Sequence, residues 1–205
     1  MRRIGILSFA TIVAGFLWTA PAHGQISLGV AAGATYSDMG GFLITATDSD
    51  WGVLLGGSGM YRFQSNLGLQ LEANWVQKGG RGTVQSVSRD LDIDYFEIPL
   101  TAQLIVGLSP KWDWNLYGGI ALAFKTKCEV SGGDAEKESC DSAVPDWTID
   151  STEWSIPFGT SFTYRLARSA LTADLRYSYG LSAAVQNLDL KNRSWQFIVR
   201  WGFEI

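Results

Sequence analysis

The chain has 205 residues, of which 46% are apolar and only 18% are charged, and its formal net charge is −4. An ordinary soluble domain carries about 25% charged residues, so this composition, with nine Trp and 23 Gly, argues against a cytosolic enzyme. The acidic balance argues against nucleic acid as a partner.

The first predicted element is a cleaved signal peptide over residues 1–24. Two arginines open the chain, an uncharged stretch covers residues 4–22, and small residues lead up to Gly24. Secretory signal peptides have this order, so we expect cleavage between Gly24 and Gln25. The mature domain, residues 25–205, would carry a net charge of about −6.

The histidine content bears directly on function, because the sole histidine, His23, lies in the predicted signal peptide. The mature domain then has no side chain whose ordinary pKa lies near neutrality, and neither a Ser-His-Asp relay nor a histidine zinc site can form. We therefore expect no catalytic residue, no cofactor and no metal site. Carboxylate-only chemistry, such as glycoside hydrolysis by Glu72 and Glu97, is the enzyme alternative that remains.

The mature sequence alternates apolar and polar residues, which is the pattern of β-strands. The alternation is clearest over residues 67–78, 171–182 and 195–205. In chain order, the eight predicted strands cover residues 26–37, 51–63, 67–78, 93–106, 112–125, 154–166, 171–182 and 195–205. Each has about 11 to 14 residues, which is enough for a tilted strand to cross a bilayer, whereas no uncharged run after the signal peptide reaches the ~18 residues of a membrane helix.

The links between the predicted strands alternate in length. The short links fall at residues 62–66, 107–111 and 166–169, and the long polar links at residues 38–50, 79–92, 127–151 and 184–192. Short turns on one rim and long loops on the other are typical of outer-membrane barrels, with the short turns on the periplasmic side. We therefore predict an all-β fold, an eight-stranded antiparallel up-and-down transmembrane β-barrel.

The two cysteines, Cys128 and Cys140, stand in one long polar link. In an exported chain this spacing predicts a disulfide, which contributes roughly 3 kcal/mol for a loop of about a dozen residues. Residues 127–150 also hold seven acidic residues against two lysines. We interpret this segment as a solvated surface loop, and binding of a divalent cation such as Ca²⁺ is the alternative.

The cost of charge in lipid decides which face of the barrel is outside. A Lys or Arg on the lipid face costs roughly 2–4 kcal/mol at midplane, so the charged face must line the interior. Because an eight-stranded barrel is filled by its own side chains, we expect carboxylates and guanidiniums to pair in a polar network in the lumen. Its predicted members are Arg62, Glu72, Glu97, Asp174, Arg176 and Arg200, with Lys125 and Arg165 on the same face.

Glycines on the inner face are interpreted as room for these long side chains and for strand coiling. They are Gly29, Gly33, Gly56, Gly119, Gly159 and Gly180. The opposite face would carry apolar residues into lipid, with aromatic girdles near the strand ends.

Several short motifs, in order along the mature chain, resemble a known family. They are Gly29-x3-Gly33-x3-Ser37, Leu69-x-Leu71-Glu72-x-Asn74-x3-Lys78-Gly79, Tyr95-Phe96-Glu97-Ile98-Pro99-Leu100, Tyr117-Gly118-Gly119 and Arg176-Tyr177-Ser178-Tyr179-Gly180-Leu181. Together they resemble the outer-membrane β-barrel proteins of the PorT or porin-like family, with small barrels of the OmpX and OmpA type as architectural relatives. The resemblance implies a place in the outer membrane of a Gram-negative cell and little about activity.

The last strand resembles the C-terminal signal that the barrel assembly machinery reads in such proteins. Its alternating residues are Phe197, Val199, Trp201, Phe203 and Ile205. Barrels of this type usually end in Phe, whereas this chain ends in Ile205 and has Phe203 two residues earlier on the same face.

We predict a monomeric, non-enzymatic barrel with a filled lumen and a structural or surface-interaction role through its long loops. The expected partners are outer-membrane lipid and lipopolysaccharide, the assembly machinery during insertion, and a surface ligand or host partner that the sequence does not identify. The alternatives are a narrow porin-like pore for small solutes or ions, a barrel enzyme acting on lipid A or a peptide, and a soluble lipocalin-like binder. The missing histidine counts against the enzyme.

Overall fold

The computed structural model describes residues 25–40, 48–84, 87–132, 135–140, 150–182 and 191–205. The predicted signal peptide lies outside these residues. Among the described residues, no helix is long and apolar enough to cross a membrane.

The described part of the chain consists almost entirely of antiparallel strands. They are β1 (Gln25–Gly40), β2 (Asp48–Gln64), β3 (Leu67–Val84), β4 (Val87–Ser109), β5 (Trp112–Gly132), β6 (Ala135–Ser139), β7 (Thr152–Arg165), β8 (Ser169–Gly180) and β9 (Lys191–Glu204).

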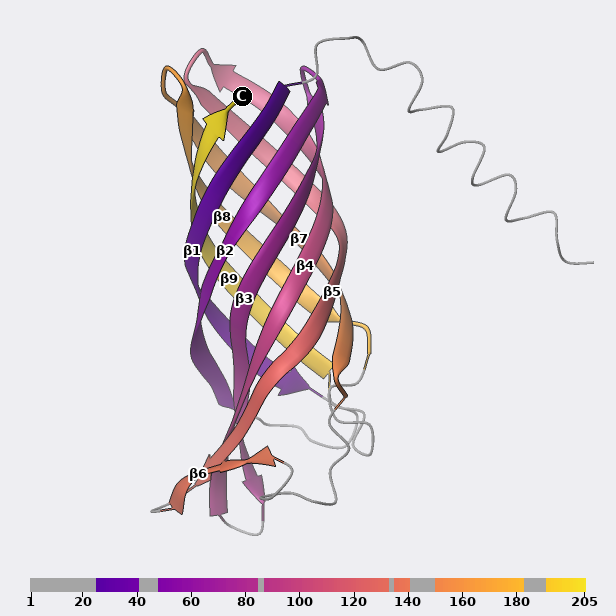
Figure 1. Ribbon diagram of the computed structural model, residues 1–205, viewed down its shortest axis with the longest axis vertical. Coiled ribbons are helices and arrows are strands. Elements are labelled where there is room, and N and C mark those ends of the chain that lie inside the picture. The colour runs from indigo at the N-terminus through magenta and orange to yellow at the C-terminus, as the bar shows by residue number, and fades with distance from the viewer. Residues whose placement is uncertain (1–24, 41–47, 85–86, 133–134, 141–149, 183–190) are drawn as a thin grey trace, which may run out of the picture.

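Eight of these strands close into a barrel (Figure 1). Each barrel strand pairs with the next one along the chain, β5 pairs with β7, and β9 returns to pair with β1. The short strand β6 adds to the outer part of β5, where Glu129 is opposite Ser139. The predicted eight-stranded up-and-down barrel is confirmed.

The two rims of the barrel differ. The turns after β2, β4 and β7 lie at one rim, together with Gln25 and the C-terminal residue Ile205, and we call this rim the turn end (Figure 1). The opposite rim, where β1 ends, β2 begins and β6 lies, is called the loop end (Figure 1).

The strands are longer at the loop end than the sequence predicts. Residues 79–92 were predicted to form a long link, but β3 continues to Val84 and β4 starts at Val87, with Gly82 opposite Arg89. The links predicted at 38–50 and 127–151 are shortened in the same way, because β1 and β5 continue into them and β2 begins before Trp51. The prediction was wrong there because strands that leave the membrane no longer need the apolar outer face that marks them in the sequence.

The alternation of side chains separates a polar inside from an apolar outside. Inward-facing Glu72, Glu97 and Arg176 are at most 2% exposed, whereas outward-facing Leu71 and Phe197 are 54% and 49% exposed. The predicted division of the two faces is confirmed.

Two of the inward glycines mark close approaches of neighbouring strands. A Cβ atom at Gly119 would collide with the carbonyl oxygen of Leu100 on β4, and one at Gly33 would collide with that of Phe197 on β9. Gly159 serves both purposes, because its Cβ would collide with the carbonyl oxygen of Leu175 on β8 and would lie 2.6 Å from the Tyr117 hydroxyl. The glycines therefore serve strand coiling as much as side-chain space.

Candidate functional site: the charged lumen

Charged side chains inside the barrel lie in three layers along its axis. The turn-end layer consists of Arg62, Asp113 and Arg165. The middle layer consists of Glu72, Asp174, Arg176 and Arg200. The loop-end layer consists of Lys78, Glu97 and Glu153.

The middle layer joins opposite walls of the barrel. Arg176 on β8 donates hydrogen bonds to both carboxylate oxygens of Glu72 on β3, at 2.6 and 3.1 Å. Arg200 on β9 reaches Glu72 at 3.2 Å and Asp174 at 3.4 Å. Two guanidiniums thus balance two carboxylates, and bidentate geometry helps offset the cost of taking these charges out of water.

Neutral side chains complete the hydrogen bonding of the middle layer. The amides of Gln70 and Asn74 donate to Glu72 at 2.5 and 2.8 Å. The Tyr117 hydroxyl donates to Asp174 and accepts a hydrogen bond of 3.2 Å from Arg176 Nε. The orientation of each charged group is therefore fixed by several contacts.

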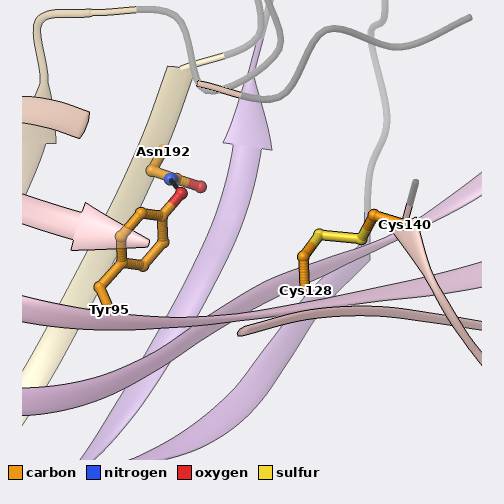
Figure 2. The surroundings of a disulfide bond; sticks show 4 residues. All are labelled: Tyr95, Cys128, Cys140 and Asn192. Carbon is orange, nitrogen blue, oxygen red and sulfur yellow. Dashed lines mark hydrogen bonds between the residues drawn. A yellow bond between two sulfur atoms is a disulfide. The ribbon is translucent and has the colours of Figure 1, made fainter. Parts of the chain in front are cut away.

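The loop-end layer has two carboxylates and one ammonium group. Lys78 Nζ lies 2.7 Å from Glu97 Oε2 and 3.6 Å from Glu153 Oε1. Asn192 donates to Glu153 Oε2 and, at 3.1 Å, to the hydroxyl of Tyr95 (Figure 2). These side chains are all at most 3% exposed, so the layer is packed away from solvent.

The turn-end layer has the opposite imbalance. Arg165 Nε donates to Asp113 Oδ2 at 2.6 Å, and Arg62 Nη2 lies 3.7 Å from the same oxygen. One carboxylate is therefore shared by two guanidiniums. The side chains of Arg62 and Arg165 are 20% and 34% exposed, so this layer is open to solvent on one side.

The structure divides the predicted lumen network. Glu72, Asp174, Arg176 and Arg200 meet in the middle layer, but Arg62 lies with Asp113, and Glu97 lies with a lysine instead of an arginine. Three titratable side chains of the layers were not predicted as members: Lys78, Asp113 and Glu153. All three had a usable signal, since Lys78 shares the alternation of Glu72, and Asp113 and Glu153 each stand next to an outward-facing tryptophan.

The predicted disulfide is present between Cys128 and Cys140, whose Cα atoms are 5.5 Å apart (Figure 2). Cys140 is 2% exposed and packs in a small apolar cluster with Ile93, Tyr95, Ala123 and Val130. The disulfide therefore joins the outer part of β5 to the end of β6.

The acidic segment over 127–150 is described only in part. Lys127 lies 2.8 Å from Glu129, and the hydrogen bond to that carboxylate raises the pKa of the lysine. Three of its seven acidic residues, Asp134, Asp141 and Asp146, lie outside the described residues, so cation binding there stays a prediction. Within the described residues, no group of three or more His, Cys, Asp or Glu side chains is placed to hold a metal ion.

The residues of the predicted C-terminal signal all face outward. Phe197, Val199, Trp201, Phe203 and Ile205 are 44% to 80% exposed. Recognition of this strand by the assembly machinery stays a prediction.

Comparisons with known proteins agree with this architecture. The family model described as outer membrane protein beta-barrel domain matches residues 20–186. Among solved structures, the chain is similar to OprG of Pseudomonas aeruginosa, with 15% identity and a TM-score of 0.55 over 88% of this chain and 96% of that one. It is also similar to Neisserial surface protein A, with 16% identity and a TM-score of 0.53 over 87% and 97% of the two chains.

At these identities the solved structures show the fold alone. No curated protein sequence matches the chain. The PorT part of the resemblance stays a prediction, whereas the resemblance to small outer-membrane barrels is confirmed.

Proposed function

The chain belongs to the outer membrane protein β-barrel domain family, and from this premise we propose that it is a non-enzymatic barrel with a closed lumen. Its role is structural or lies in surface interactions at the loop end. The turn end, with both ends of the barrel sequence, faces the periplasm, as in other barrels of this kind.

The middle layer is the observation that carries the proposal of a closed lumen. Cavities at the turn end and the loop end share no lining residue, and the middle layer lies between them. A continuous water column would have to separate Glu72 from Arg176, which is completely buried. Breaking such a pair leaves buried charges without compensation and is strongly unfavourable.

The same contacts support a role without catalysis. Glu72 and Glu97, the carboxylates considered for glycoside hydrolysis, are each held by a different cation, Arg176 and Lys78 respectively. A general acid would need a carboxyl group that holds a proton beside the substrate, and a filled lumen admits no glycan.

Outer-membrane lipid is the partner that the outer face supports best. Rings on neighbouring strands form a girdle toward the loop end, with centroids 5.0 Å apart for Tyr36 and Trp51 and 4.9 Å apart for Tyr177 and Trp195. Interfacial girdles of this kind are typical of membrane barrels. The eight barrel strands close into a ring, so within that described ring no strand edge is left for a second copy, which supports a monomer.

Conductance tests the closed lumen. In planar bilayers the purified protein is expected to give no sustained openings, and an open porin added to the same bilayer shows that channels are detectable. Reproducible long-lived channels would contradict the proposal and favour the narrow pore.

A role in surface interactions needs a separate test. We expect ligands found by a surface-binding screen to depend on the segment between Cys128 and Cys140. Deletion of that segment, compared with the intact protein, should remove binding while the barrel stays folded. Binding that survives the deletion would place the interaction on another part of the loop end.

A further inference from the structure

A cavity of about 80 Å³ lies at the turn end of the lumen. Residues from every barrel strand line it, among them the side chains of the turn-end layer. Since one water needs about 10–15 Å³ by this measure, the cavity has room for a polyatomic ion. The middle layer closes its inner side, so it is a pocket that opens toward the turn end.

The charged lining of this pocket is rich in guanidiniums. Those of Arg62, Arg165 and Arg200 line it together with the carboxylates of Asp113 and Glu204, and the charge of Arg200 is balanced on the inner side by the middle layer. Arg62 and Arg165 share the same oxygen of Asp113, Oδ2. The distance from Arg62 Nη2 to this oxygen is 3.7 Å, which is too long for a hydrogen bond. Arg62 therefore has donors that Asp113 does not use.

A buried donor in the lining provides a second, independent observation. Arg200 is 8% exposed, and its Nη atoms are directed to the carboxylates of the middle layer. Its Nε, however, has no hydrogen-bond partner among the described residues. A buried donor left without an acceptor is costly, and in a pocket lined by Arg200 it indicates an acceptor that occupies the cavity.

We propose that the pocket binds a small oxyanion of the phosphate or sulfate type. Guanidiniums present paired N–H donors that match the oxygens of such anions. Arg62 and Arg165 would hold the anion from the side open to solvent, and Arg200 Nε would donate from the buried side. Neutral donors in the lining complete the site, among them Ser58, Ser161 and Thr172. The inference goes beyond the proposed function and is independent of whether the lumen conducts.

Titration of the folded protein with phosphate tests the proposal. Isothermal titration at constant ionic strength, with chloride replaced stepwise by inorganic phosphate, should show saturable binding. Arg62→Gln should weaken the affinity about tenfold or more, because charged hydrogen bonds are lost. Arg168→Gln is the matched control, because Arg168 is exposed on the turn after β7 and does not line the pocket; its affinity should equal that of the wild type.

A second variant keeps the test decisive if Arg62→Gln does not fold. Gln103 lines the pocket, and Gln103→Glu has nearly the same shape but adds a negative charge, so it should also weaken phosphate binding. A phosphate monoester in a parallel titration distinguishes an inorganic ion from a phosphorylated molecule as the ligand. Absence of saturable binding by the wild type would overturn the proposal, as would equal weakening in Arg168→Gln or no weakening in either pocket variant.

Discussion

Arg176 is the residue on which the middle layer depends most. It is completely buried and donates to both oxygens of Glu72. Removing one partner of a buried ion pair leaves an uncompensated charge and costs about 3–5 kcal/mol. We therefore expect Arg176→Met to lower the free energy of unfolding by that amount in urea titrations of the protein in lipid vesicles, with heat-modifiable migration on a gel as the measure of folding.

Two control variants show whether the loss comes from the unpaired charge. The double variant Glu72→Gln with Arg176→Met leaves Arg200 and Asp174 as a balanced pair, 3.4 Å apart, and should recover much of the loss. Lys111→Met changes an exposed turn residue and should shift the free energy by less than about 0.5 kcal/mol. Equal stability of Arg176→Met and the wild type would mean that the pair contributes nothing.

The sequence predicts which side chains lie inside the barrel but not which of them meet. Alternation alone places Glu72 and Arg176 on the inner face. Their contact joins residues 104 positions apart, and it depends on the tilt and stagger of strands that a period of two does not encode. For the same reason Glu97 was predicted to pair with arginine, although Lys78 is its partner.

Strand β5 extends beyond the part of the barrel that the apolar pattern marks. Its residues from Lys127 onward pair with the outer part of β4 and then with β6. Strand number and faces were predictable, because lipid requires an apolar outer face in every membrane strand. The extension of β5 was not predictable, because strand pairing in water does not require an apolar outer face.

The disulfide constrains this extension and not the barrel itself. Its loop is short, so its contribution of roughly 3 kcal/mol acts on β6 and the outer part of β5. We expect the double variant Cys128→Ser with Cys140→Ser to keep the heat-modifiable migration of the wild type, while trypsin cuts faster at Lys127, whose side chain is 58% exposed. Mass spectrometry of the fragments locates the cuts.

Wild-type protein, with and without a reducing agent, is the control for this experiment. Reduction should reproduce the faster cleavage. If the double variant instead loses heat-modifiable migration, the disulfide also supports the closure of the barrel, which would contradict its restriction to β6 and the outer part of β5.

The molecule as a whole is asymmetric along its axis. The turn-end layer has more guanidiniums than carboxylates, the middle layer is balanced, and the loop-end layer has more carboxylates than ammonium groups. The two mouths of the lumen therefore attract ions of opposite sign. The orientation of the barrel therefore decides which ions each mouth meets. We propose that the loop end lies outside the cell.

Labelling of single cysteines tests that orientation. The native cysteines are joined in a disulfide and do not react, so Lys127→Cys at the loop end and Lys111→Cys at the turn end each provide one reactive thiol. A polymer-linked maleimide too large for porins should label Lys127→Cys on intact cells. It should label Lys111→Cys only after the outer membrane is permeabilised, because the turn between β4 and β5 would lie on the periplasmic side. The reverse pattern would invert the proposed orientation, and it would place the oxyanion pocket on the cell surface.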